Sequence, residues 1–314
     1  MEIKQVAIPT IYRNIVNVFI TKGDTLTVVD AGFKSEEGQM QIEAALREWS
    51  YTLADVEQVL LTHHHPDHCG LVDLFERANV IGHAYCNHFL QPTEAFLSYY
   101  EAYHIQLLQQ HGIFGAEQML RDFLASDMPH FGTTPVTTPL QHLQEVPGMQ
   151  GFVAHYTPGH SESHFIYVNE ATGVGFGGDL ILDTITPNPF IEPPLDLSFR
   201  RDSSLLRYHE SLAHVNTLHI DTLYTGHGQP IQDVAARIKG IRKQQHDRAM
   251  KLLQLFKAQE AYSAPQLAKL LFGPVFEKQP ALTLSETIGQ LDYLVQQQQI
   301  KQHNAQQIYY TLIG

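Results

Sequence analysis

Short apolar runs alternate with polar turns through most of the first 245 residues. Runs that are rich in β-branched and aromatic residues predict strands at 16–20, 26–32, 53–62, 80–85, 152–156, 165–168, 175–178 and 221–224. Amphipathic stretches predict helices at 35–50, 68–78, 198–216 and 231–259. The mixture of strands and helices predicts an α+β fold.

Residues 88–131 have a different pattern, which is helical and rich in aromatic side chains, with a break near His111-Gly112. Two interpretations have equal weight. The aromatic residues could form part of the core, or the helices could form a cap whose apolar side makes a substrate pocket. Tyr99 and Tyr103 are the candidate substrate contacts in this segment.

The last part of the chain predicts two helices, at 264–272 and 283–299, followed by a β-hairpin built from 300–302 and 307–312. This is the element order of a winged-helix module. Residues 237–314 carry ten basic and five acidic residues, whereas residues 1–236 carry ten and 28. The acidic main part argues against a surface that wraps nucleic acid.

The composition excludes several classes of protein. Apolar residues make up 43% of the chain, which suits a globular protein with a core, and no run of about 18 apolar residues could cross a membrane. Only two cysteines occur, and the first residues lack the pattern of a signal peptide. We therefore expect a cytoplasmic protein without structural disulfides.

A dense histidine stretch, Leu61-Thr62-His63-His64-His65-Pro66-Asp67-His68, follows the run at 53–62. Because side chains alternate along a strand, His63 and His65 share one face and His64 points the other way. Imidazole and carboxylate groups are ligands for zinc, iron and related metals. The stretch predicts one side of a metal site.

Three later segments place a metal-capable residue next to glycine at the end of a short β-rich run. They contain His160, Asp179 and His227, and Asp30 ends an earlier apolar run in the same way. Together with the histidine stretch, the three later segments make four strand ends in sequence, which indicates that their side chains meet at one edge of a β structure. Asp30 alone is more typical of a cap at the start of a loop, and it gains interest only if its strand ends near His63.

The complete set resembles the metallo-β-lactamase fold hydrolase superfamily, in particular its glyoxalase II, lactonase and ribonuclease Z-like types with two metal ions. The resemblance rests on His63-x-His65-x-Asp67-His68 and on the later His160, Asp179 and His227. It implies an αββα four-layer sandwich over residues 1–245, with a helical cap insertion at about 88–131. The remaining residues, 246–314, resemble the winged-helix-like C-terminal extension of one branch.

By resemblance, two divalent metal ions bind here, zinc ahead of iron or manganese. His63, His65 and His160 hold the first ion, Asp67, His68 and His227 the second, and Asp179 bridges both. Asp67 and Asp179 are the expected catalytic residues, and Asp30 supports the ligands through hydrogen bonds. His64 is expected not to bind metal, because a register starting there would require Pro66 as a ligand.

The presence of Asp179 disfavours a β-lactam substrate, because the β-lactamases of the superfamily usually lack this carboxylate. The leading hypothesis is hydrolysis of a thioester or lactone by a metal-bridging hydroxide. A phosphodiesterase or nuclease reaction at the same site is the alternative. A third hypothesis, a DNA-binding regulator, is disfavoured because the helix at 283–299 has no Arg or Lys.

The expected partner is therefore a small molecule with an apolar portion, with Tyr99, Tyr103 and Asn188 as candidate contacts, and not a nucleic acid or a membrane. We expect the C-terminal module to pack over the active-site rim or in a homodimer.

Overall fold

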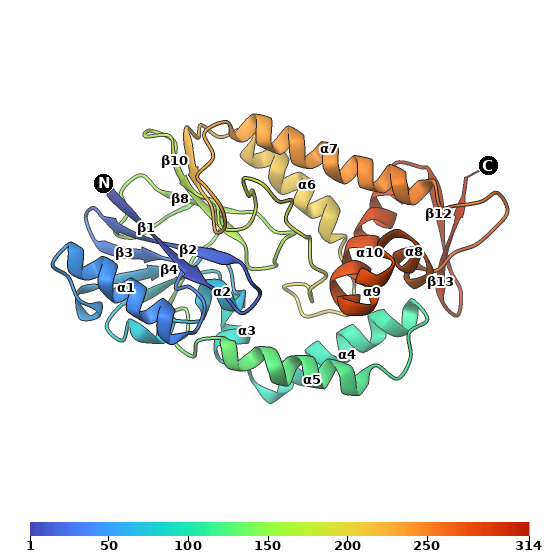
Figure 1. Cartoon of the computed structure of the whole chain (residues 1–314), viewed down its shortest axis with the longest axis horizontal. Helices are drawn as coiled ribbons and strands as arrows, with labels where there is room; N and C mark the ends of the chain where they lie inside the picture. Colours follow the sequence, from blue (N-terminus) through green and yellow to red (C-terminus); the bar gives the residue numbers. More distant parts are fainter. Residues whose placement is uncertain (314) are drawn as a thin grey trace.

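Two β-sheets lie face to face between layers of helices in the computed structural model, which describes residues 1–313 (Figure 1). The first sheet has the strand order β1-β2-β3-β4-β5-β6, and the second has the order β11-β10-β9-β8-β7. The strands of the first sheet are β1 (Glu2–Pro9), β2 (Ile15–Lys22), β3 (Leu26–Val29), β4 (Gln58–Leu60), β5 (Asn79–Gly82) and β6 (Thr138–Pro139). Those of the second are β7 (Gln144–Glu145), β8 (Val153–Tyr156), β9 (Phe165–Asn169), β10 (Val174–Phe176) and β11 (Thr222–Tyr224).

Three apolar cores separate the four layers. Helix α1 (Glu36–Glu48) covers the outer face of the first sheet, where Ile42 and Leu46 pack on Val18 and Val28. The inner faces of the two sheets enclose a second core that includes Phe176. Helices α6 (Ser204–Val215) and α7 (Val234–Leu253) pack on the outer face of the second sheet. The predicted αββα sandwich is confirmed by this arrangement.

The strands β3, β4 and β5 run parallel and are buried along almost their whole length, which explains their continuous apolar sequences. Parallel strands end at the same edge of a sheet. This edge carries Asp30 after β3 and the histidine stretch after β4. The edge of the second sheet carries the segments with His160, Asp179 and His227 after β8, β10 and β11.

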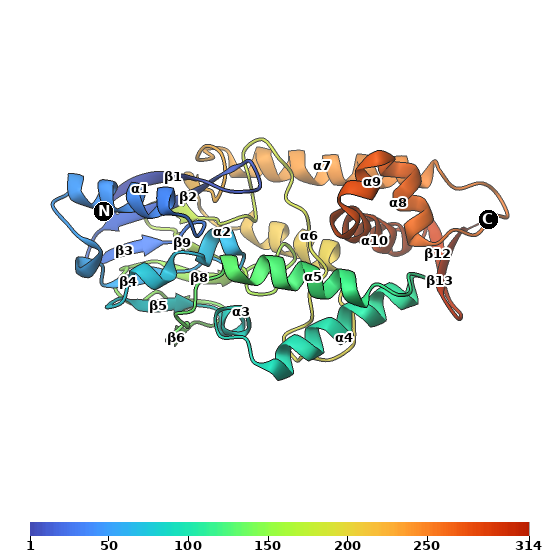
Figure 2. The same cartoon turned by 60° about the horizontal axis from the view of Figure 1, so that its bottom comes forward.

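The segment 88–131 forms two long helices, α4 (Glu94–Gln110) and α5 (Glu117–Asp127), after the short α3 (Asn87–Leu90). The break predicted near His111-Gly112 is present, and Gly112 has a φ of +82°. In Figure 2 both helices lie along one side of the molecule, between the sheets and the C-terminal elements. Tyr103 and Leu107 of α4 join the C-terminal core, and Phe96 joins the core of the first sheet.

The C-terminal region contains α8 (Ala264–Phe272), α9 (Pro274–Lys278), α10 (Pro280–Gln296) and a hairpin of β12 (Ile300–Asn304) and β13 (Ile308–Leu312). Ser263 begins α8 with a capping box, in which Gln266 is the reciprocal partner. Helix α10 is buried over most of its length, with Ile288 and Leu291 fully enclosed. The winged-helix assignment stays a prediction, as does the domain boundary at 245/246, which lies inside α7.

Several predicted elements are shorter than the sequence pattern indicated. The predicted helix at 68–78 is wrong: α2 spans only Pro66–Cys69 and a 3₁₀ turn follows at Val72–Leu74. Gly70 itself keeps helical dihedral angles (φ −62°, ψ −40°), but the Leu71 backbone N–H donates to the Gly32 carbonyl at 3.3 Å and not to the preceding turn of the helix. The strand predicted at 53–62 begins with a 3₁₀ turn at Leu53–Asp55, and its strand part, β4, ends at Leu60, so the histidine stretch lies in a loop and not on a strand face. The helices predicted at 198–216 and 231–259 are shorter at both ends.

Candidate metal centre

Three imidazoles converge at the end of β4. The Nδ1 atom of His65 lies 2.9 Å from His63 Nε2 and 3.1 Å from His160 Nε2. Ligand atoms that are about 2.0–2.1 Å from a tetrahedral zinc ion lie roughly 3.3 Å from one another. The three nitrogen atoms therefore have the spacing of a metal-binding triad, and they are the three histidines predicted for the first ion.

A second group lies beside the first. His227 Nε2 lies 3.4 Å from Asp67 Oδ2, and His68 Nε2 lies 4.0 Å from Asp67 Oδ1. Asp179 stands between the two groups, with carboxylate oxygens 3.4 Å from His68 Nε2, 3.3 Å from His227 Nε2 and 3.7 Å from His160 Nε2. Its position fits the bridging role that the resemblance implied, and that role stays a prediction.

The second ring nitrogen of every predicted histidine ligand has a partner outside the centre. His68 Nδ1 donates to Asp30 at 2.7 Å, His160 Nδ1 to the Asn188 carbonyl at 3.0 Å, and His227 Nδ1 to the carbonyl of residue 15 at 2.5 Å. His63 Nδ1 contacts Thr62 Oγ1 at 3.0 Å. Such contacts fix the tautomer and the ring orientation of a metal ligand. His65 is the remaining case, and its partner is Glu192.

The atoms that face the centre fit divalent cations. His68 Nε2 and Asp179 Oδ1 are buried without a hydrogen-bond partner among the described residues. Gly226 leaves the necessary space, because a Cβ there would collide with Asp179 Oδ1 and lie 2.6 Å from His68 Cε1. A donor set of imidazoles and carboxylates suits zinc and its neighbours.

The electrostatics of the centre also favour cations. Burial lowers the pKa of His160 to about 4, so this imidazole is neutral and can act as a ligand at neutral pH. Burial opposes charge on Asp179, but His227 and His68 outweigh it and hold the pKa of this carboxyl well below its usual range. Burial likewise lowers the pKa of His227, but Asp179 and Asp67 raise it to about 10. In the absence of metal, the carboxylates thus draw protons onto the histidines that would otherwise bind cations.

His64 and His164 lie outside both groups. His64 stacks on Phe89, with ring centroids 3.9 Å apart, and its Nδ1 lies 2.8 Å from Ser163 Oγ. His164 Nε2 accepts a hydrogen bond from the Asp179 backbone at 3.1 Å and so positions the loop that carries Asp179. These contacts agree with the prediction that His64 does not belong to either triad.

Two residues at the centre were missed from the sequence. Glu192 contacts His65, and Tyr12, in the β1–β2 turn, donates a hydrogen bond from its hydroxyl to Asp127 of α5 at 3.0 Å. Burial and Asp127 raise the pKa of Tyr12, and Asp67 adds to the rise, so its hydroxyl stays protonated beside the centre. An isolated Glu within Phe190-Ile191-Glu192-Pro193 was the only sequence signal for Glu192.

The three predicted substrate contacts occupy different places. Asn188 lies at the centre, where its carbonyl accepts from His160 and its side-chain nitrogen lies 3.4 Å from the Leu282 carbonyl. Tyr99 donates to the Ser198 carbonyl at 2.7 Å, and Tyr103 is buried in the C-terminal core. Substrate contact by any of these residues stays a prediction.

A sequence model described as the metallo-beta-lactamase superfamily matches residues 12–227, which include every predicted ligand. The chain belongs to this superfamily. The curated probable metallo-hydrolase YqjP of Bacillus subtilis (strain 168) is 33% identical over 282 residues, which cover 88% of this chain and 86% of that protein. This member of the metallo-β-lactamase superfamily is thus a metal-dependent hydrolase.

Solved structures agree over nearly the whole length. The metallo-beta-lactamase family protein TTHA1429 from Thermus thermophilus matches with a TM-score of 0.80 and 26% identity, covering 99% of this chain and 98% of the other. A beta-lactamase domain protein from Burkholderia ambifaria matches with a TM-score of 0.77 and 20% identity, covering 99% and 92%. The C-terminal region therefore has counterparts in both structures. No helix among residues 1–313 is long and apolar enough to cross a membrane.

Proposed function

We propose that this superfamily member hydrolyses a carboxylic acid derivative with an apolar portion, either a thioester or a lactone, and that it uses two divalent ions, zinc ahead of iron or manganese. When bound, the ions would activate water at neutral pH and polarise the carbonyl group. His63, His65 and His160 would hold one ion, and Asp67, His68 and His227 the other, with Asp179 shared.

The observation that carries the proposal is an aromatic side chain, Phe190, beside the first triad. The Phe190 ring lies against His65 and His160, with ring centroids 5.4 Å and 5.7 Å apart, and its side chain is partly exposed. Within residues 1–313, no Lys or Arg side chain forms an ion pair or hydrogen bond with any predicted ligand. An aromatic ring beside the centre and the lack of Lys or Arg contacts with the predicted ligands suit an acyl substrate better than a polyanionic one.

The chain supplies the groups that a carbonyl substrate needs. Asp67 is slightly exposed and contacts His227, so it can accept a proton from the attacking water or deliver one to an alkoxide leaving group. A thiolate leaving group needs no such proton, and a thioester therefore places the smallest demand on these residues.

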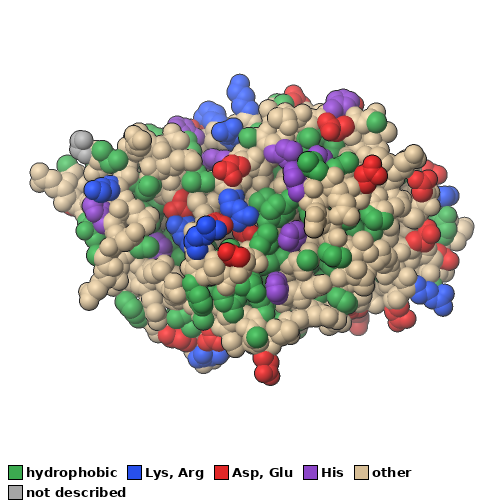
Figure 3. Space-filling model, turned by 180° about the vertical axis from the view of Figure 1, so that it is seen from behind, with side chains coloured by type: hydrophobic (Ala, Val, Ile, Leu, Met, Phe, Trp, Pro, Cys, Tyr) green, Lys and Arg blue, Asp and Glu red, His purple; other side chains and the backbone are tan. Residues whose placement is uncertain are grey.

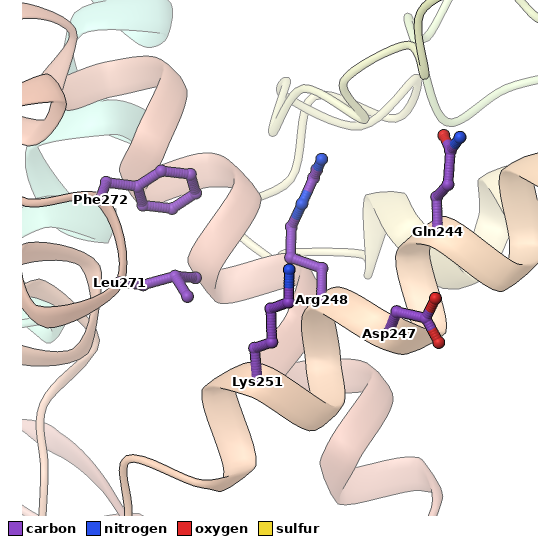
Figure 4. Close-up of a pocket in the computed structure, with 6 residues that line it drawn as sticks. All are labelled: Gln244, Asp247, Arg248, Lys251, Leu271 and Phe272. Atoms are coloured by element: carbon purple, nitrogen blue, oxygen red, sulfur yellow. The ribbon is translucent and has the colours of Figure 1, made fainter.

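Phosphodiester hydrolysis is the alternative, and the basic C-terminal region favours it. Arg248 and Lys251 line a cavity of about 370 Å³ between α7 and α8, together with Gln244 and Leu271 (Figure 4). However, Arg248 already pairs with the buried Glu286 at 2.6 Å. On the face shown in Figure 3, Lys and Arg side chains lie among acidic, histidine and apolar side chains. These features support a small-molecule substrate over a nucleic acid.

The helix that would read DNA in a winged-helix module is α10. Its residues from Thr283 to Asp292 are buried against the rest of the protein, so they are not available to a DNA groove. This burial supports the proposal that the C-terminal region packs against the hydrolase core instead of binding nucleic acid. Partners other than the substrate, including a second copy of the chain, stay a matter of prediction.

The test is to assay the metal-loaded protein with acyl thioesters of increasing chain length, with an aliphatic lactone, and with bis-p-nitrophenyl phosphate. We expect turnover of an acyl substrate, with kcat/KM rising with the length of the acyl chain. Replacing Phe190 with Ala should reduce that rise by about tenfold or more, since burial of two to three methylene groups contributes about 0.8 kcal/mol each. Turnover of the phosphodiester alone would refute the acyl proposal.

A further inference from the structure

The segment 187–193 connects the metal centre with the C-terminal region, and it contains a buried carboxylate with no role assigned so far. The side chain of Glu192 is only 7% exposed. Its Oε2 accepts a hydrogen bond from the Glu162 backbone at 2.6 Å, and its Oε1 lies 3.4 Å from His65 Nε2 and 3.3 Å from His64 Nε2. A buried carboxylate needs such donors, because an unpaired buried charge is strongly destabilising.

The direction of the contact with His65 is informative. His65 faces the other two imidazoles of the first triad with Nδ1, so its Nε2 points away from the centre towards Glu192. A neutral imidazole carries its proton on one nitrogen only. If Glu192 accepts the proton on Nε2, then Nδ1 is left as a free lone pair aimed at the metal position. The same arrangement orients metal-binding histidines in general.

We propose that Glu192 is a positioning residue that fixes the tautomer and ring orientation of His65, and that helix α10 holds the segment carrying Glu192 in place. The proposal rests on the two-ion centre proposed above but not on the identity of the substrate. It gives Glu192 the role of orienting His65, and it gives the C-terminal region the role of supporting the segment that carries Glu192.

Helix α10 holds the segment through one side chain in particular. The Ser285 hydroxyl donates to the Pro189 carbonyl at 3.1 Å and accepts from the Ile191 backbone at 3.1 Å. Ser285 is itself buried, and although the Pro189 carbonyl also accepts from Ser204 of α6 at 3.2 Å, the Ile191 backbone N–H would lose its acceptor without Ser285. The segment held in this way supplies the Asn188 carbonyl to His160 as well as the Glu192 carboxylate to His65. Two of the three ligands of the first ion therefore depend on backbone that is fixed by α10.

A third metal ion between His64, His65 and Glu192 is the competing explanation, since their ligand atoms lie close together. It would require His65 to bind a cation through each ring nitrogen, which takes the imidazolate form. His64 Nε2 and His65 Nε2 can each donate to Glu192 Oε1 as neutral imidazoles, with no such requirement. We therefore favour hydrogen bonds at this position, and the number of bound ions distinguishes the two.

The first experiment measures metal binding by Glu192→Ala, Glu192→Gln and Glu192→Asp. Zinc content after dialysis and competition with a chromophoric chelator give the stoichiometry and the two affinities, and the cobalt(II) spectrum reports the ligand geometry. We expect Glu192→Ala to weaken one of the two ions by about 10–100-fold and to leave the other within about threefold of wild type. Glu192→Asp should restore part of the loss, because it keeps the charge.

Glu286→Gln is the matched control, because Glu286 is also a buried glutamate but pairs with Arg248 and has no hydrogen bond or ion pair with a predicted ligand. Equal weakening in this control, or unchanged affinities in Glu192→Ala, would overturn the proposal. A third equivalent of zinc that disappears only in Glu192→Ala would overturn it in favour of a third ion. The zinc stoichiometry of the wild-type protein tests the metal centre independently of Glu192. If the wild-type protein binds no divalent ion, the two-ion centre is refuted.

The second experiment tests the role of α10 with Ser285→Ala, compared with Thr287→Ala. Thr287 is a buried hydroxyl on the same helix, but it donates only to the Thr283 carbonyl within the helix. We expect Ser285→Ala to weaken the same ion as Glu192→Ala, by a smaller factor, and Thr287→Ala to weaken neither. If Ser285→Ala lowers the Tm but changes neither affinity, then α10 does not act on the centre and this part of the proposal is wrong.

Discussion

Asp30 connects the first sheet with the metal centre and allows a quantitative prediction. It is buried with a φ of +58°, and its carboxylate accepts from the Thr62 backbone at 2.8 Å, from the Thr62 hydroxyl at 2.8 Å and from His68 Nδ1 at 2.7 Å. The substitutions Asp30→Ala and Asp30→Asn separate the structural from the metal-related part of this network, because Asn keeps the shape and reverses one hydrogen bond.

Asp30→Ala removes the acceptor of two fixed, buried N–H groups, those of the Thr62 backbone and His68 Nδ1, and also of the Thr62 hydroxyl, which can rotate. Each unpaired buried donor costs about 1–3 kcal/mol, so the loss of stability should be about 2–6 kcal/mol. Alanine also tolerates a positive φ less well than Asp or Asn. Asp30→Asn can still accept from Thr62 and should cost the smaller part of this range.

The stability of Asp30→Asn does not predict its metal affinity. This variant should fold well but bind the second ion weakly. The Asn amide would donate to His68 Nδ1, which then holds no proton and leaves the proton on Nε2. Since Nε2 is the atom that faces Asp179 and the second ion position, Asp30→Asn should weaken that ion by about 10–100-fold despite a well-folded protein. Denaturant unfolding of the metal-free protein and zinc competition measure the two effects separately.

Asp73→Asn provides the control. Asp73 also accepts three hydrogen bonds, from the backbones of Thr133 and Thr134 and from the Thr134 hydroxyl, but it contacts none of the predicted ligands. It should lose stability without losing zinc. Wild-type affinity for both ions in Asp30→Asn, or equal zinc loss in Asp73→Asn, would refute the argument from the His68 tautomer.

Two further predictions concern Asp179 compared with His64, and the pH dependence of stability that His155 causes. Asp179→Ala should abolish most activity and lower zinc content, whereas His64→Ala should keep both ions, and equal metal loss in the two variants would refute the ligand register. Burial and His214 lower the pKa of His155 to about 4, below its value of about 6.5 in the unfolded chain. Between pH 4 and pH 6.5 the unfolded state therefore binds more protons than the folded state. The stability that depends on neutral His155 is at most about 3 kcal/mol; it is complete above about pH 6.5 and is lost as the pH falls towards 4. His155→Gln should flatten this part of the stability profile in chemical unfolding measured from about pH 4 to 7; an unchanged slope would show that His155 does not cause it.

The residues that sequence reasoning could place are those with a local pattern. The recurrence of metal-capable residues after strands indicated that His160 and Asp179 belong with the histidine stretch. The alternation argument for His63 and His65 does not apply, because β4 ends at Leu60 and both histidines lie in the loop that follows it. The argument from recurrence needs only the positions at which the strands end. It does not depend on how the chain packs elsewhere.

Glu192 could not be placed in this way, because its partners His65 and Glu162 lie 127 and 30 residues away and its own neighbours have no periodic pattern. The helix expected at 68–78 failed for a related reason. Its sequence is compatible with a helix, but the Leu71 backbone N–H donates to the Gly32 carbonyl in the folded chain. Contacts between distant segments decide both cases, and no local pattern reports them.

Helix α7 spans the predicted domain boundary at 245/246. It runs from Val234 to Leu253 without interruption, with its first part on the second sheet and its last part in the C-terminal core, where Leu252 meets Leu107 of the cap. Cutting the chain near residue 245 would sever this helix in mid-course and uncover apolar surface on both fragments. A chain truncated near residue 245 is therefore expected to have a lower Tm than the whole chain.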